Sequence, residues 1–221
     1  MSEYKFTKDW FNWAPEVWTQ LIPLLPESGR NFLEIGSFEG RSMVWIVENM
    51  MGPGDWIDCV DTWQGGEEHA EEDMHTVEAS FDYNTIKVLD CHSAQHRSRE
   101  GSWGHTRFAS DGPDRTNNRV YKYKATSTEF LGSKLAGYNR KDLYDFIYID
   151  GSHIAKDVLT DACMAWPLLK SKGLMVFDDY MWGNPRDILH RPKPAIDAFC
   201  NLFAEEAEII HVGYQLVVRK K

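Results

Sequence analysis

The sequence predicts a single α/β domain with a mostly parallel sheet that is covered by helices on both faces. Short apolar runs recur along the 221 residues, and segments with helical apolar periodicity separate them. Strands that alternate with helices are typical of parallel sheets. The length also suits one domain of this class. We therefore expect one domain over 1–221, with an N-terminal helical extension at 1–29 and a loop insertion at 91–118.

Five apolar runs are the expected central strands, at 31–36, 55–61, 119–125, 144–150 and 173–179. Helices are expected where apolar residues repeat every three or four positions, as from Ile154 to Trp166 and from Ile196 to Phe203. After these come "AEIIHV" and "YQLVVRK", separated only by Gly213. We expect these two runs to form an antiparallel pair that closes one edge of the sheet.

The insertion at 91–118 is rich in Ser, Gly, His, Arg and Asp and has no apolar period. Loops of this length are uncommon in compact domains and often act as lids. It holds Cys91, His92, His96 and His105, but their spacing does not match that of structural zinc sites. We expect a solvated loop here.

Composition excludes some classes of partner. The chain has 34 acidic and 24 basic residues, and the resulting net charge of -10 argues against binding to nucleic acid. Its four cysteines have no paired spacing, which fits a reducing compartment. We find neither a signal-peptide pattern nor an apolar run long enough to cross a bilayer. We expect a cytoplasmic protein that does not bind membranes.

Four aromatic residues lie close together in the sequence near the N-terminus: Trp10, Phe11, Trp13 and Trp18. We expect them to be exposed and to provide a packing surface. The sequence leaves open whether this surface is intramolecular or belongs to a homo-oligomer.

A glycine-rich turn follows the first strand, in "FLEIGSFEGRS", and precedes a helix that begins near Arg41. Open α/β sheets bind nucleotide-like ligands at this position. The spacing Glu34-x-Gly36-x-x-x-Gly40 differs from the Gly-x-Gly-x-x-Gly pattern of dinucleotide enzymes. Asp61, at the end of the second strand, can accept hydrogen bonds from both hydroxyls of a ribose. We therefore expect a ligand that has a ribose but no pyrophosphate. The alternatives are a tight turn without a ligand and, for Asp61, a capping or turn residue.

Carboxylates follow the fourth and fifth strands: Asp150 after one, and Asp178 and Asp179 after the other. If these strands are neighbours, the three side chains converge and suit a hard cation such as Mg²⁺, which lowers the pKa of a coordinated oxygen. Alternatively, they bond the amino group of a cofactor or backbone donors. His153 is the candidate general base, unless it only orients the helix that follows.

Four segments in this order carry a resemblance: "FLEIGSFEGRS", "VDTWQGGEEH", the run from "YIDGSH" to "FDDY", and "PAIDAF". Together they resemble the class I S-adenosylmethionine-dependent methyltransferases, in particular a group related to the macrolide-sugar and catechol O-methyltransferases. The resemblance implies a Rossmann-like three-layer sandwich. Its seven-stranded sheet would have the order 3-2-1-4-5-7-6, with an antiparallel last strand.

The resemblance also implies roles for individual residues. Gly36 and Ser37 would lie beside the methionine part of S-adenosylmethionine, Asp61 at the ribose, Trp63 over the cofactor and Ser127 at the adenine. For Ser127, an ordinary helix N-cap is an alternative, and Thr126 is its close rival. The full cofactor-binding set is Glu34, Gly36, Ser37, Gly40, Asp61, Thr62, Trp63, Ser127 and Asp150. The catalytic residues would be His153 and Asp150, and the Mg²⁺ ligands Asp150, Asp178 and Asp179.

The predicted function is transfer of a methyl group to a hydroxyl of a small molecule, for instance a sugar or another natural product, with assistance from Mg²⁺. Loops at 63–73 and 180–192 would form the acceptor pocket together with the insertion at 91–118. Trp63, Tyr180 and Trp182 would stack there on a sugar or aromatic ring, with simple loop packing as the alternative. Two alternatives use the same scaffold. One is a nucleotide-dependent oxidoreductase or hydroxylase, and the other a non-catalytic module that binds S-adenosylmethionine.

Overall fold

The computed structural model describes residues 3–66, 72–90, 95–99, 102–110, 117–137, 143–183 and 187–221. They fall into two compact units. The first unit comprises 1–30 and 37–125, and the second comprises 31–36 and 126–221.

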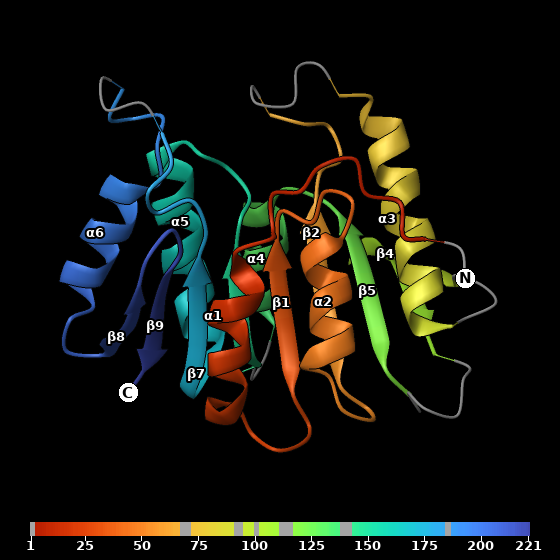
Figure 1. Cartoon of the computed structure of the whole chain (residues 1–221), viewed down its shortest axis with the longest axis horizontal. Helices are drawn as coiled ribbons and strands as arrows, with labels where there is room; N and C mark the ends of the chain where they lie inside the picture. Colours follow the sequence, from red (N-terminus) through yellow and green to blue (C-terminus); the bar gives the residue numbers. More distant parts are fainter. Residues whose placement is uncertain are drawn as a thin grey trace. The chain divides into compact units, whose positions relative to one another are not determined.

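The first unit contains a four-strand arrangement in the order β3-β4-β5-β2, together with three α-helices (Figure 1). Its elements are α1 (Ala14–Leu21), the 3₁₀ turn η1 (Ile22–Leu24), α2 (Arg41–Asn49), β2 (Trp56–Asp61), α3 (Met74–Leu89), β3 (Gln95–Arg99), β4 (Ser102–Ala109) and β5 (Arg119–Lys124). Strands β2 and β5 are parallel, as expected for the second and third central strands. Helix α2 begins at Arg41, where the sequence predicted it.

Strands β3 and β4 lie within 91–118, so the prediction of a loop is wrong for these residues. The predicted count of seven strands is wrong for the same reason, because β3 and β4 add two. β4 pairs antiparallel with both β3 and β5. Main-chain hydrogen bonds form such an edge ladder without a regular apolar pattern, which explains why these residues show no strand pattern in the sequence. Phe108 of β4 is buried, and His105 packs against the rings of Tyr121 and Tyr123. Cys91 and His92 lie outside the described residues.

The second unit has strands in the order β1-β6-β7-β9-β8 (Figure 1). Its elements are β1 (Asn31–Ile35), α4 (Ser127–Ala136), β6 (Tyr144–Ile149), α5 (Ala155–Ala165), the 3₁₀ turn η4 (Trp166–Leu168), β7 (Leu169–Phe177), α6 (Lys193–Leu202), β8 (Ala207–Val212) and β9 (Leu216–Lys220). β1, β6 and β7 are parallel, whereas β9 is antiparallel to β7 and to β8. This order confirms the predicted 1-4-5-7-6 part of the sheet and its antiparallel last strand.

The parallel strands of the second unit supply its core. Every residue of β6 is buried, and so are residues 173–177 of β7. Helices α5 and α6 contact each other, and α6 buries Ile196 and Phe199. In the register of the two strands Ile149 is opposite Phe177, so β6 and β7 end side by side. The residues that follow them, Asp150 and Asp178, are therefore brought together.

The N-terminal aromatic residues divide into two pairs. Trp10 and Trp13 are exposed, as predicted, whereas Phe11 and Trp18 are buried. Trp18 lies on the inner side of α1, where its ring meets those of Phe11 and of Trp45 from α2. This packing explains why the prediction of exposure fails for Phe11 and Trp18. No described helix is long and apolar enough to cross a membrane.

Candidate functional site

In the first unit, the glycine-rich turn from Ser37 to Gly40 is closed by its own backbone. We call it the cofactor turn. The amide of Gly40 donates to the carbonyl of Ser37 over 2.7 Å, and Gly40 is the left-handed N-cap of α2. A Cβ atom at Gly40 would lie 2.9 Å from side-chain atoms of Met43 and Phe81. The turn therefore depends on glycine at this position.

Asp61 binds the cofactor turn directly. Its Oδ2 accepts hydrogen bonds from the amides of Ser37 and Phe38, both over 2.9 Å. Its Oδ1 accepts from the amide of Trp63 over 2.7 Å. An ionised carboxylate has about four acceptor positions, so three are already in use. The predicted bonds to two ribose hydroxyls would need more positions than remain.

Trp63 also supports the turn. Its side chain is buried, and its indole Nε1 donates to the carbonyl of Phe38 over 2.9 Å. Trp63 was predicted to cover the cofactor, but its ring packs against Phe81 inside the unit. Thr62 accepts a hydrogen bond from the amide of Gln64. The hydroxyl of Ser37 is buried and has no hydrogen-bond partner among the described residues, so it is available to a ligand.

In the second unit, Gly36 allows β1 and β6 to end close together. Gly36 has a φ of +85°, and a Cβ atom there would lie 1.9 Å from the carbonyl oxygen of Asp150. The amide of Asp150 donates to the carbonyl of Ile35 over 2.8 Å. Glu34 is fully buried on β1, opposite Tyr148 of β6. No side chain larger than glycine fits at position 36.

Tyr148 links two of the predicted carboxylates. Its hydroxyl lies 2.9 Å from Oδ2 of Asp150 and also contacts Oδ2 of Asp178. The hydroxyl has only one proton, so both contacts are hydrogen bonds only when one of the carboxyl groups is protonated. Tyr148 was not among the predicted site residues. It could have been found from its position two residues before Asp150 on a strand, because residues two apart on a strand have their side chains on the same face.

The pKa values of this cluster support a shared proton. Burial raises the pKa of Asp150 well above its usual value, and repulsion from Asp178 and Asp179 adds to the effect. Burial and repulsion from Asp179 raise the pKa of Asp178 to about 6. The cluster therefore binds protons, or a cation in their place, more readily than isolated aspartates do.

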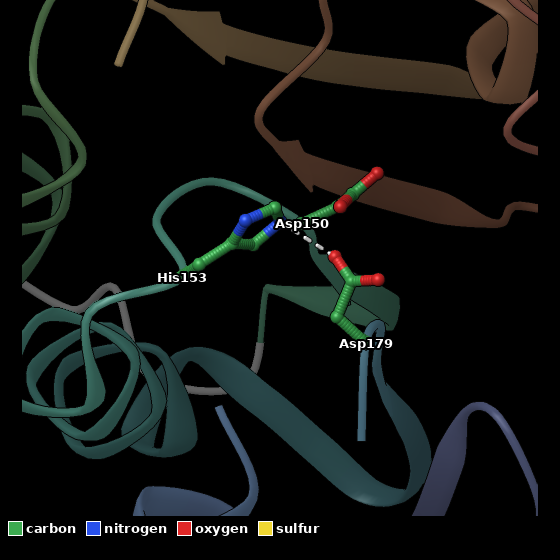
Figure 2. A group of neighbouring side chains, drawn as sticks. All are labelled: Asp150, His153 and Asp179. Atoms are coloured by element: carbon green, nitrogen blue, oxygen red, sulfur yellow. Dashed lines mark ion pairs between the residues drawn. The ribbon is translucent and has the colours of Figure 1, made fainter. Parts of the chain in front are cut away.

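Asp179 pairs with His153 (Figure 2). The Nε2 atom of His153 lies 2.7 Å from Oδ2 of Asp179, and the hydroxyl of Tyr214 donates to Oδ1 over 2.9 Å. The ring of Trp182 lies 4.2 Å from that of His153, between ring centroids. Tyr180, another predicted pocket residue, is buried and bonds Asp197.

One group in the described part of the chain has the geometry to hold a metal ion: Asp150, His153 and Asp179, whose ligand atoms lie within 4.8 Å of one another. Figure 2 shows these three side chains. The predicted ligand Asp178 is not part of this group. Its Oδ1 accepts from the amide of Asp179 over 2.8 Å, and its Oδ2 contacts Tyr148. Two of the three predicted ligands, Asp150 and Asp179, therefore lie in one group with His153, and their binding of a metal stays a prediction.

At the start of α4, the N-cap is Thr126, which forms a capping box with Glu129. The capping alternative considered for Ser127 therefore falls to Thr126. Ser127 is the first residue of the helix, and its hydroxyl bonds Asp161 of α5. Asp161 is 2% exposed, and burial raises its pKa to about 6. The predicted contact of Ser127 with adenine stays a prediction.

A glycine turn and an acidic cluster at the ends of parallel strands define a class of α/β enzymes that act on nucleotide-like cofactors. The family model described as "Methyltransferase domain" matches residues 33–180, and the chain belongs to this family. This confirms the predicted class I S-adenosylmethionine-dependent methyltransferase. A search of curated proteins found no match.

Solved structures support the same fold. An O-methyltransferase from Bacillus cereus in complex with SAH is 16% identical, with a TM-score of 0.56 over 100% of this chain and 84% of its own. The O-methyltransferase TomG from Streptomyces achromogenes, involved in tomaymycin synthesis and in complex with SAM, is 14% identical, with a TM-score of 0.61 over 94% and 80%. The MycE methyltransferase of the mycinamycin biosynthetic pathway, in complex with Mg and SAH, is 17% identical, with a TM-score of 0.54 over 98% and 51%.

Proposed function

We propose that this protein transfers the methyl group of S-adenosylmethionine to a hydroxyl oxygen of a small molecule, such as a sugar or another natural product. Mg²⁺ would be held by Asp150 and Asp179, and His153 would be the general base. The pairing of His153 with Asp179 beside Asp150 carries this proposal. It is also supported by the names of similar structures, two of which are O-methyltransferases and one of which contains Mg.

The residues of the cofactor turn fit S-adenosylmethionine. The buried hydroxyl of Ser37 lacks a hydrogen-bond partner in the described structure, so it can bond a polar group of the ligand. Ser37 would hold the methionine part, and Asp61 has about one acceptor position left. When bound, the cofactor supplies a methyl group on a positively charged sulfur.

The acidic cluster fits Mg²⁺. Mg²⁺ prefers oxygen ligands and is usually bound through one or two carboxylates with water. Asp150 and Asp179 supply these oxygens, and raised pKa values in the cluster show that unbalanced negative charge is costly there. When bound, the cation lowers the pKa of a hydroxyl that coordinates it.

His153 is better suited to hold a proton than to bind this metal, because imidazole is a softer ligand than Mg²⁺ prefers. The carboxylate of Asp179 fixes the proton on Nε2 and so sets the tautomer and the ring orientation. Nδ1, which is shielded from solvent, is then the nitrogen that accepts a proton. The indole of Trp182 packs against this ring, with the ring centroids 4.2 Å apart.

Two measurements test the proposal. Isothermal titration calorimetry should show binding of S-adenosylhomocysteine and none of NAD. Transfer of a labelled methyl group from S-adenosylmethionine should then be assayed on a panel of catechols, glycosides and hydroxylated natural products, with Mg²⁺ or EDTA. We expect transfer that EDTA abolishes. Activity that survives EDTA would contradict the role of the metal, and absence of cofactor binding would contradict the whole proposal.

A pair of variants makes the metal test specific. Asp179→Asn removes the charge from the proposed site, whereas Asp9→Asn removes it from an exposed aspartate that pairs with Arg41 and lies outside the predicted pocket loops. We expect loss of activity only for the first. Equal effects of both variants would show that the measured loss is not due to this site.

A further inference from the structure

The hydrogen bonds of Asp61 indicate a role at the cofactor turn, which was left open above as the alternative to binding of the ribose. We propose that Asp61 is a positioning residue, whose carboxylate holds the cofactor turn in its binding conformation. Its effect on cofactor affinity then passes through the amides of the turn and not through the hydroxyls of the ribose. This inference rests on the proposed binding of S-adenosylmethionine.

The hydrogen bonds of Asp61 are the first observation. Its carboxylate accepts from the amides of Ser37, Phe38 and Trp63 over 2.9, 2.9 and 2.7 Å. These distances are those of good hydrogen bonds to a charged acceptor. One side chain at the end of β2 therefore binds two successive amides of the turn and the start of its own loop.

Backbone strain is the second observation. Phe38 and Trp63 both have a φ of +46°, in the left-handed region that residues with a side chain rarely adopt. Each of these two residues donates its own amide to Asp61. The carboxylate thus stabilises the backbone at both of these strained residues, which a residue that bound only the ribose would not need to do.

A buried lysine completes the support. Lys122 of β5 is 6% exposed, and lysine is rarely so buried unless it is paired. Its Nζ lies 2.8 Å from Glu78 and 2.7 Å from Asp82, both on α3, and 4.6 Å from the centroid of the Trp63 ring. The indole of Trp63 in turn donates to the carbonyl of Phe38. Contacts within the first unit therefore run from α3 and β5 through Trp63 to the cofactor turn.

The capacity of the carboxylate limits what else it can bind. With about four acceptor positions and three in use, about one remains. Bonds to both ribose hydroxyls would displace at least one amide and release a strained residue. Direct recognition of both hydroxyls by Asp61 would thus weaken the turn that binds the rest of the cofactor.

The test compares two ligands in two proteins by isothermal titration calorimetry. The ligands are S-adenosylhomocysteine and its analogue without the two ribose hydroxyls. The proteins are the wild type and Asp61→Asn, whose amide nitrogen cannot accept a hydrogen bond from the backbone. We expect Asp61→Asn to lower the affinity for both ligands by about tenfold or more, as for a lost hydrogen bond to a charged group. Removing the ribose hydroxyls from the ligand should then lower its affinity by the same factor in both proteins. If removal of the hydroxyls weakens binding to the wild type but not to Asp61→Asn, the carboxylate binds the ribose and the proposal is wrong.

Amide hydrogen exchange in the protein without ligand gives a second readout. The amides of Ser37, Phe38 and Trp63 should exchange slowly in the wild type and fast in Asp61→Asn. Fast exchange of these amides in the wild type would overturn the proposal. If the wild type does not bind S-adenosylhomocysteine, the proposed function fails, and amide exchange alone then decides on Asp61.

Two lysines on β5 provide a matched pair of variants. Lys122→Met removes the charge beside Trp63, and Lys124→Met removes an exposed charge that pairs with the same Glu78. We expect Lys122→Met to lower the affinity for S-adenosylhomocysteine several-fold and to speed hydrogen exchange at the amide of Trp63. Lys124→Met should change neither. Equal effects of both variants would contradict the part assigned to Lys122.

Discussion

The Nε2 atom of His153 lies 2.7 Å from Oδ2 of Asp179. This contact joins the segment after β6 to the segment after β7, and Asp179 forms it from a left-handed conformation with a φ of +56°. Strained residues of this kind are concentrated at functional sites. The pair, with Asp150 beside it, is the basis of the proposed chemistry.

Replacing His153 tests the proposed base. With any acceptor that the wild type methylates, His153→Gln should lower kcat by about 10²- to 10⁴-fold, as for loss of a general base. Binding of S-adenosylhomocysteine should stay unchanged, because His153 is not one of the residues proposed to hold the cofactor. Parallel assays of His211→Gln, a change on β8 and outside the predicted pocket loops, provide the control. An active His153→Gln enzyme would exclude the histidine as the base.

Added Mg²⁺ should stabilise the folded protein, because a ligand that binds only the folded state raises its unfolding temperature. The raised pKa values of Asp150 and Asp178 mean that the ionised cluster costs stability as the pH rises. Protonated carboxyl groups do not bind the cation, so the gain should be larger at about pH 8 than at about pH 5. Thermal unfolding of the wild type and of Asp150→Asn, each with and without Mg²⁺, would measure this rise in unfolding temperature. A shift of equal size in Asp150→Asn would place the cation elsewhere.

Gly36→Ala should be far more damaging than Gly54→Ala. Both glycines have a φ of +85°, so the backbone cost is matched. At Gly54 nothing lies within 4 Å of an added Cβ, whereas at Gly36 the carbonyl of Asp150 would be 1.9 Å away. We expect about 1–2 kcal/mol of destabilisation for Gly54→Ala and more than about 4 kcal/mol for Gly36→Ala. Urea unfolding gives both values, and similar values would show that β1 and β6 do not end this close together.

Asp161→Asn should stabilise the protein at neutral pH. Burial raises the pKa of Asp161 from 3.8 to about 6 in the folded state. The folded state therefore binds the proton more tightly than the unfolded state, and stability falls as the pH rises from about 4 to about 6. Removing the charge should recover up to about 3 kcal/mol above this range. Unfolding at several pH values checks this, and the gain should vanish below about pH 4. A gain that does not depend on pH would rule out the titration of Asp161 as its cause.

The sequence predicted the elements whose signal is local. Apolar runs gave β1, β2, β5, β6 and β7 because buried parallel strands are continuously apolar. β3 and β4 were missed because their pairing depends on main-chain bonds to a strand already in place. At the site, strand order brought Asp150 and Asp179 together as predicted. The roles of Tyr148, Asp61 and Lys122 depend on distances between side chains, which sequence spacing does not give.

A crystal structure with S-adenosylhomocysteine and Mn²⁺, used in place of Mg²⁺, tests the central claim most directly. We predict an anomalous peak bound by carboxylate oxygens of Asp150 and Asp179, with the ligand's homocysteine part at Ser37. The same crystal without Mn²⁺ is the control. A fully occupied ligand with no anomalous peak at these aspartates would contradict the metal-assisted mechanism.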